Sequence, residues 1–211
     1  FRSNLLARWE KVTLNPAIYA SSVDDFFKTI SLQQAENIFG LEDGMVITRP
    51  VNLGTEQNLG LEMTASYRPV EAVSLFGEFN YYGFRESGIF EGRDFAVTGS
   101  AWSFSTRALL SLPKDVRFQT RYRYAAPVRD AQSIQRANWQ ADFSLSKQWS
   151  DKYTVSVNAR SGRFRDTAIF TPNFTEDNFA RWTGWRFGMN FQYRFEKGAK
   201  SSERRQRGRI R

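Results

Sequence analysis

The sequence predicts an all-β fold, an antiparallel transmembrane β-barrel, and three observations carry this prediction. Large apolar side chains alternate with polar ones in segment after segment, and this period of two gives a strand one apolar face and one wet face. The segments approach the length of about 9 to 11 residues that a tilted strand needs to cross a bilayer. The links between them alternate between tight turns and long connections. A soluble sandwich shares the alternation within strands but has no reason to keep this asymmetry of its links.

The alternating segments predict about eight antiparallel strands. The first is the least regular and lies near Leu5 to Tyr19. The others are expected within Asn58–Arg68, Val73–Phe84, Trp102–Leu112, Val116–Ala126, Trp139–Lys147, Tyr153–Arg160 and Trp185–Phe195.

The clearest strand is the last, in which every second residue is large and apolar. Its two faces differ so strongly that we expect one to contact lipid and the other to line a polar interior. The predicted lipid-facing residues are Trp185, Phe187, Met189, Phe191, Tyr193 and Phe195.

The opposite faces of the strands carry more arginine than carboxylate. The predicted lumen-facing arginines are Arg107, Arg117, Arg121, Arg123, Arg160, Arg186 and Arg194, against Glu62, Glu78 and Asp142. This balance is poor for a closed, dry interior, because unpaired buried charges are costly. It suits a water-filled lumen, in which the charges stay hydrated.

The links give the strands a direction. Short links occur at Arg68–Ala72, Leu112–Val116 and Trp149–Tyr153, and long ones at Ala20–Gly44, Glu86–Ser100, Val128–Gln135 and Thr167–Ala180. Outer-membrane barrels have short periplasmic turns and longer extracellular loops, so the last strand is expected to run from the cell surface to the periplasm. Aromatic girdles would then include Trp182 and Trp185 outside, and Tyr67, Trp149, Tyr153 and Phe195 inside.

The positive charge gathers at the end of the chain. Residues 196–211 hold +5 of the net charge of +8. We therefore predict a transmembrane barrel segment over residues 1–195 and a basic, disordered periplasmic tail over residues 196–211. The tail lacks interleaved aromatic residues, and the rest of the chain carries only +3. No nucleic-acid partner is expected.

The composition disfavours enzymes and metal proteins. The chain contains no cysteine and no histidine, which removes disulfides, the usual zinc ligands, thiol nucleophiles and the commonest general base. The acidic residues of the predicted loops match no calcium-loop pattern. We expect no enzymatic activity, no catalytic residue, no cofactor and no metal. Three aromatic residues on the predicted inner face, Phe76, Tyr82 and Phe84, are candidates for stacking on a ligand or on packed loops.

Several stretches resemble a known family. They are "RPVNLGTEQNLGLEMTASYRP", "FQTRYRYAAP", "ADFSLSKQWSDKYTVSVNAR" and the terminal "FGMNFQYRFEKG" with its basic tail. Together they are similar to the C-terminal β-barrel portion of a TonB-dependent outer-membrane receptor, in the outer membrane protein β-barrel family. The resemblance covers most of the chain. It departs from the family at Arg160, Ser161 and Gly162, where an acidic residue is expected, and at Phe195, which is not the last residue.

The resemblance implies a barrel of about 22 strands in the outer membrane of a Gram-negative cell, which imports a metal chelate, oligosaccharide or peptide. The implied partners are outer-membrane lipid, a TonB-type energy-coupling protein reached through an N-terminal region not seen here, and the barrel assembly machinery at the last strand. The chain starts at Phe1 without a leader, so we expect a piece of a longer precursor or a trimmed form. Two alternatives stay open: a free-standing eight-stranded outer-membrane barrel, acting as an anchor or a lipid-modifying enzyme, and a soluble ligand-binding β-barrel.

Overall fold

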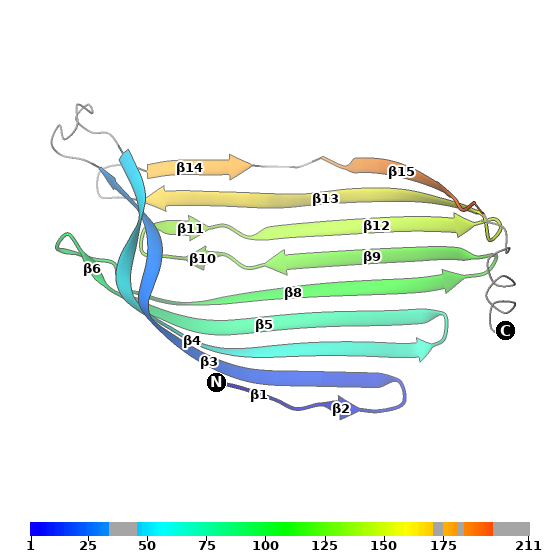
Figure 1. Cartoon of the computed structure of the whole chain (residues 1–211), viewed down its shortest axis with the longest axis horizontal. Helices are drawn as coiled ribbons and strands as arrows, with labels where there is room; N and C mark the ends of the chain where they lie inside the picture. Colours follow the sequence, from blue (N-terminus) through cyan, green and yellow to red (C-terminus); the bar gives the residue numbers. More distant parts are fainter. Residues whose placement is uncertain (34–45, 171–174, 181–183, 196–211) are drawn as a thin grey trace, which may run out of the picture.

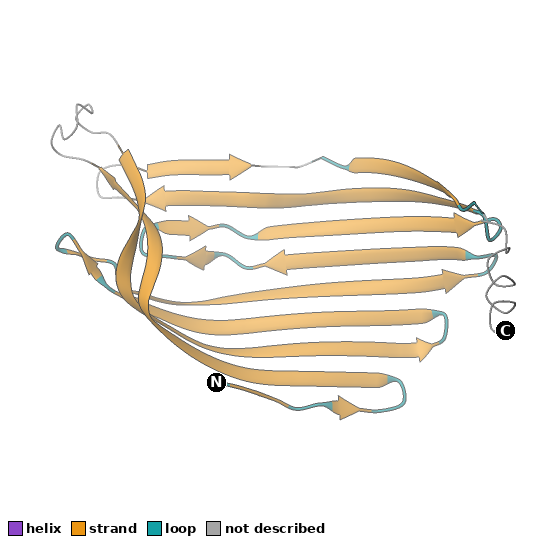
Figure 2. Cartoon of the chain, in the orientation of Figure 1, coloured by secondary structure: helices purple, strands orange, loops and turns teal. Residues whose placement is uncertain are grey.

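The computed structural model describes residues 1–33, 46–170, 175–180 and 184–195, and these residues form strands and short turns (Figure 2). A 13-stranded sheet contains nearly all of them, and a separate two-stranded ribbon contains the rest. No helix in these ranges is long and apolar enough to cross a membrane. The all-β, antiparallel fold that the alternation predicts is confirmed.

The longer strands follow one another across the sheet in chain order, each antiparallel to its neighbour (Figure 1). They are β3 (Val12–Gln33), β4 (Val46–Val70), β5 (Val73–Ser87), β8 (Val97–Leu112), β9 (Val116–Ala125), β12 (Asn138–Gln148), β13 (Tyr153–Phe170) and β15 (Arg186–Tyr193). This meander is the topology of an up-and-down barrel wall.

Short strands complete the sheet. At one edge, β1 (Arg2–Asn4) and β2 (Ala7–Arg8) pair with β3, and β14 (Thr175–Ala180) pairs with β13 near the other edge. The remaining short strands are β6 (Ile89–Phe90), β7 (Arg93–Asp94), β10 (Val128–Arg129) and β11 (Ser133–Gln135). All of them extend or link the long strands.

The asymmetry of the links is present, but the predicted long connections are wrong in detail. Tight turns join the strands at one end, and the other end carries hairpin extensions (Figure 1). The expected loop Ala20–Gly44 is strand as far as Gln33, and β4 starts as early as Val46. The other three predicted loops contain β6 and β7, β10 and β11, and β14. Adjacent strands keep pairing beyond the predicted spans because each backbone N–H and C=O group needs a partner.

The first predicted strand is also corrected. A turn at Trp9, whose amide donates to the Val12 carbonyl at 2.8 Å, separates β2 from β3. The first long strand therefore begins at Val12 rather than near Leu5. Residues between Leu5 and Trp9 belong to a short edge segment that folds back on β3.

A bulge divides the β3–β4 hairpin into two parts. The register shifts between Val23 and Phe27, where Asp25 has a φ of 56°, and Gly54 opposite has a φ of 117°. A Cβ atom on Gly54 would lie 2.7 Å from the Ser87 carbonyl oxygen, so only glycine fits there. Bulges bend a strand and increase its twist. Beyond this one the hairpin arches across the ends of the other strands (Figure 1).

The cross-strand register puts the alternating residues of neighbouring strands in phase. Arg107, Arg121, Asp142, Arg160 and Arg186 are successive partners across β8, β9, β12, β13 and β15. We call the face that carries them the polar face. Leu110, Phe118, Leu145, Val157 and Met189 form an equivalent series three positions away along each strand, on what we call the apolar face.

The sheet has little core of its own. The buried apolar cluster of the described residues consists of Ile30, Val51, Leu53 and Phe95, with Leu32 and Phe90 against it. All of these lie in the arching hairpin or beside it, outside the regular part of the sheet. On the regular part the apolar side chains remain uncovered: Phe187 and Met189 are each 74% exposed.

Candidate functional site on the polar face

Arginine gathers on one half of the polar face. Arg107 of β8 lies directly opposite Arg121 of β9, and Arg160 of β13 lies opposite Arg186 of β15. Asp142 stands between Arg121 and Arg160 in the same row. The structure thus brings four of the seven arginines predicted to face the lumen into one line across five strands. We call this line the arginine row.

The other three predicted arginines lie beside the row. Arg123 is on β9 opposite Gln140, and Arg117 is opposite Ser111 and Ser146, so both share the face of the row. Arg194 follows the end of β15, where its amide donates to the Lys152 carbonyl at 2.9 Å. That these residues face an aqueous lumen stays a prediction.

Asp142 is the main anionic partner within the row. It accepts a hydrogen bond from Arg160 Nε, and Arg123 lies 3.8 Å from its other carboxylate oxygen, to which Gln140 also donates at 2.6 Å. Asp142, Arg123 and Arg160 border a surface hollow of about 460 Å³, lined also by Arg121, Arg186, Gln119, Ser144 and Asn158. The hollow is therefore lined by one carboxylate, that of Asp142, and by four guanidinium groups.

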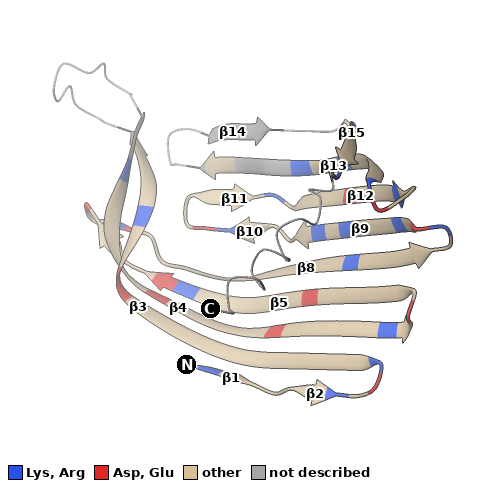
Figure 3. Cartoon of the chain, turned by 45° about the vertical axis from the view of Figure 1, so that its right-hand side comes forward, with Lys and Arg blue, Asp and Glu red and all other residues tan. Residues whose placement is uncertain are grey.

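The other half of the polar face is acidic. Glu56 and Glu62 lie on β4, and Glu78 and Glu86 lie on β5. Figure 3 shows acidic positions on β4 and β5, beside some basic ones, and mostly basic positions on β8, β9, β12 and β13. Glu62 is paired with Arg2 at 2.6 Å, and Glu78 accepts a hydrogen bond from Ser105 at 2.8 Å. Charge is thus separated across the sheet.

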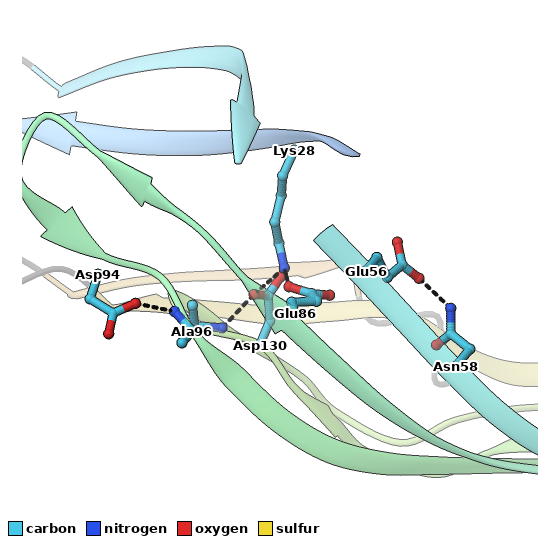
Figure 4. A network of polar contacts seen from close by, with 8 residues as sticks. Lys28, Glu56, Asn58, Glu86, Asp94, Ala96 and Asp130 are labelled. Carbon is cyan, nitrogen blue, oxygen red and sulfur yellow. Dashed lines mark hydrogen bonds and ion pairs between the residues drawn. The ribbon is translucent and has the colours of Figure 1, made fainter. Parts of the chain in front are cut away.

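A lysine fastens the arching hairpin to this face. Lys28 of β3 forms ion pairs with Glu86 of β5 and with Asp130, which follows β10, the latter at 2.5 Å (Figure 4). The Lys28 side chain is 14% exposed and that of Glu86 16%. We call these three residues the lysine clamp. Sequence reasoning missed the clamp, because its lysine lies in a segment that was expected to be loop.

Two further hydrogen bonds support the clamp. The Ser31 amide donates to Gln132 Oε1, and Gln132 Nε2 donates to the Ser31 carbonyl, both at 3.0 Å. Ser31 and Gln132 lie 101 residues apart in the chain. The outer part of the β3–β4 hairpin therefore bridges the sheet from its first long strands to the β10–β11 connection. Because Lys28 reaches Glu86, the bridge passes on the polar side.

Aromatic rings on the polar face pack over glycine. A Cβ atom on Gly60 would lie 2.3 Å from Cζ of Tyr19, and one on Gly99 would lie 2.7 Å from Cζ of Phe84. Phe84 is only 8% exposed, so it has little surface for a ligand. Phe76 has the guanidinium of Arg107 at 6.0 Å from its ring centre. These contacts favour the packing role for two of the three aromatic candidates.

Two aromatic groups mark the apolar face. Near the tight turns, the Tyr153 and Tyr193 ring centres are 5.0 Å apart. Further along, Trp102 and Tyr124 are 5.0 Å apart, and Tyr122 is 6.4 Å from Trp139. Trp139 pairs with Arg163 of β13, and Arg163 is ten residues along that strand from Tyr153. Ten residues span roughly 33 Å along a strand, which at the usual tilt is close to the apolar band of about 25 Å in outer-membrane barrels.

The predicted girdle residues fall into this arrangement in part. Tyr153 and Phe195 lie at the turn end, where the Phe195 ring contacts Tyr193 at 4.5 Å. Trp185 contacts Phe143, with ring centres 5.9 Å apart. Trp182 lies outside the described residues. The second aromatic group, around Trp102 and Trp139, was not predicted to be a girdle, although each residue was placed on an apolar strand face. That either group forms a girdle stays a prediction.

Among the residues that the structure describes, no group of three or more carboxylates is placed to hold a metal ion. The residues of the polar face offer guanidinium, amide, hydroxyl and carboxylate groups. This set can form hydrogen bonds and ion pairs with a solute in water.

An open sheet with one uncovered apolar face and one charged face is typical of the wall of a transmembrane β-barrel. The model of the Outer membrane protein beta-barrel family matches residues 2–193, and the chain belongs to this family. It is therefore an outer-membrane protein, and the lipid of that membrane surrounds it.

No curated protein matches the chain. Among solved structures, the crystal structure of the Ralstonia pickettii toluene transporter TbuX is similar, with 10% identity and a TM-score of 0.37 over 92% of this chain and 65% of that one. The chain spans slightly less than two thirds of that transporter's length.

Proposed function

We propose that the chain forms the C-terminal part of the barrel of a TonB-dependent outer-membrane receptor that imports a bulky nutrient. The nutrient class is a metal chelate, an oligosaccharide or a peptide. The observation that carries the proposal is the polar face of a curved, open sheet of long strands, on which Arg107, Arg117 and Arg121 have no ion-pair partner among the described residues. Such a face needs a wide aqueous interior, because unpaired charges are too costly in a dry one.

The edges of the sheet support a large barrel. The strand order runs from β1 at one edge to β13, β14 and β15 at the other. Unpaired edge groups are not tolerated in lipid, so additional strands or closure must satisfy them. A barrel of about 22 strands encloses a wide lumen, whereas about eight strands leave room only for side chains. The charges of the arginine row fit the larger interior better.

The proposal assigns partners to particular regions. A TonB-type energy-coupling protein would act on an N-terminal region that precedes the barrel wall. The barrel assembly machinery would contact the last strand, β15, and the aromatic Phe195 after it. Residues 196–211 would extend into the periplasm. The role is transport, with no enzymatic step.

Genetic epistasis tests the proposal. Uptake of a fixed panel, comprising iron chelates, oligosaccharides and peptides, is measured in strains that lack this gene, the energy-coupling protein, or both. We expect loss of uptake of at least one panel member in the first strain, and no further loss of that member in the double mutant. Uptake that needs this gene but continues without energy coupling would contradict the proposal and favour a passive barrel.

A further inference from the structure

The arginine row contains like charges in direct opposition. Arg107 and Arg121 are cross-strand partners, and directly opposite residues have Cβ atoms about 5 Å apart. Neither forms an ion pair within the described part of the chain; Arg107 contacts the ring of Phe76. Like charges in this position destabilise a sheet. An anion bound between the two guanidinium groups would remove this cost.

The neighbouring carboxylate is already used. Both oxygens of Asp142 have partners, in Arg160 and Gln140, with Arg123 at 3.8 Å. Its side chain is 24% exposed. Asp142 therefore has little capacity left for Arg121, which stands directly opposite it. The hollow beside Asp142 keeps a net positive charge.

The chemistry of the row defines the ligand. A guanidinium binds carboxylate or phosphate through two parallel hydrogen bonds. Strands lie about 4.8 Å apart, so adjacent arginines can each take one anionic group of the same molecule. A monovalent ion would be held weakly, because it has one anionic group for two guanidinium groups. The hollow of about 460 Å³ lined by Arg121 is large enough for a small molecule, and Arg107 adjoins it as the cross-strand partner of Arg121.

We propose that the arginine row, with Arg107 and Arg121 as its main contacts, binds a solute carrying two or more carboxylate or phosphate groups. The acidic half of the polar face repels such a solute and confines it to β8, β9, β12 and β13. This proposal deepens the transport function above and rests on it, because it names the chemical class of the cargo or of a group on the cargo.

Lipid headgroups share this chemistry. The register, however, places the row on the face opposite Val157 and Met189, which we assign to lipid. The proposed ligand is therefore a solute in the lumen and not a lipid headgroup. Competition by anionic lipid is the outcome that would point to the other source.

Calorimetric titration of the purified full-length protein in neutral detergent micelles tests the proposal. The probes are citrate and tripolyphosphate at low ionic strength, with spermidine as a cationic control of similar size. We expect both anions to bind, spermidine not to bind, and the dissociation constant for the anions to rise with salt. Absence of binding by both anions would overturn the proposal.

Variants locate the binding. Arg121→Gln and Arg107→Gln should each weaken binding of both anions about tenfold, in line with the loss of one charge-assisted contact. Arg121→Lys keeps the positive charge but loses the planar guanidinium that forms two parallel hydrogen bonds. Its affinity for the anions should therefore lie between those of wild type and Arg121→Gln. Arg68→Gln is the matched control, because Arg68 is exposed next to a tight turn and lies outside the row. Equal affinity in wild type and both glutamine variants would refute the assignment, as would an equal loss in the control.

Folding of each variant is checked by its β-sheet circular dichroism and protease resistance, and a variant that fails is replaced by Arg121→Lys in the comparison. In vesicles of phosphatidylcholine, adding phosphatidylglycerol should leave citrate binding unchanged; competition would overturn the lumen assignment. These measurements require no energy coupling. Failure here would leave the epistasis test intact, and failure of that test would leave the binding result standing.

Discussion

At the scale of single residues, the two faces of the last strand should differ in how well they tolerate a charged residue. Met189 pairs with Val157 on the apolar face, and its neighbour Asn190 pairs with Ser156 on the polar face. Met189 is four residues from Tyr193, roughly 13 Å along the strand, which is near the middle of an apolar band of about 25 Å. Arginine should therefore be tolerated at one of these adjacent positions and not at the other.

Met189→Arg is expected to destabilise the folded protein in lipid by about 2 to 4 kcal/mol, because the charge is placed near the bilayer midplane. Asn190→Arg should cost much less, since the polar face is hydrated. Reversible unfolding in liposomes measures both free energies. Equal penalties for the two variants would reject the assignment of Trp185, Phe187, Met189, Phe191, Tyr193 and Phe195 to lipid.

At the scale of elements, the arching β3–β4 hairpin depends on the lysine clamp. Lys28→Met leaves Glu86 and Asp130 beside each other without their shared cation. The loss should cost about 1 to 3 kcal/mol, the usual penalty for a half-buried group without a partner. Because the clamp holds only the outer part of this hairpin and not the regular part of the sheet, the effect should appear as local opening rather than global unfolding.

Amide hydrogen exchange checks this prediction. Exchange in β3 and β4 beyond the bulge should accelerate in Lys28→Met, while exchange in β9 and β12 stays as in wild type. The triple variant with Glu86→Gln and Asp130→Asn should recover part of the protection, because it removes the unpaired charges. Arg93→Met serves as the control, because it removes an exposed cation of β7 that lies outside the clamp. Unchanged exchange in Lys28→Met would show that Ser31, Gln132 and the apolar cluster suffice.

The bulge gives a second prediction for this element. Gly54→Ala places a Cβ atom 2.7 Å from a backbone oxygen at a φ of 117°. The variant should lose more than about 1 kcal/mol, since alanine is strained at positive φ. Gly92→Ala is a matched control, because Gly92 also has a positive φ of 72° but nothing lies within 4 Å of an added Cβ. Thermal unfolding should show a larger loss at Gly54 than at Gly92.

The same hairpin shows where the sequence is informative and where it is not. The alternation in Trp185–Phe195 and Tyr153–Arg160 predicts both strands and their faces, since period two is a local signal. The segment "ASSVDDFF" in β3 breaks the alternation at a bulge, so the sequence predicts a loop there. The contact of Ser31 with Gln132 joins residues 101 positions apart, and no local pattern encodes it. The arginines were assigned to one face, but their alignment in a row depends on register between strands.

At the scale of the whole molecule, the partners of the two sheet edges distinguish a large barrel from a small one. The larger barrel predicts that β15 and the β1–β2 edge pair with other strands, whereas a free-standing barrel of eight strands predicts that they pair with each other. A disulfide distinguishes these cases, because it forms only when two Cα atoms lie within about 7 Å. The chain has no native cysteine, so an introduced pair has no competing thiol within these residues.

We expect no cross-link between Phe191→Cys on β15 and cysteine at Ser3, Leu5 or Ala7, tested one at a time in native membranes under mild oxidation. The positive control combines Phe191→Cys with Val155→Cys, which are direct partners on β15 and β13 and should cross-link. Mobility on non-reducing gels and the masses of the linked peptides report the outcome. A disulfide from β15 to any of the three edge positions would mean that the sheet closes on itself. The lumen would then be too narrow for a bulky nutrient, and the arginine row would need internal counter-charges instead of a solute.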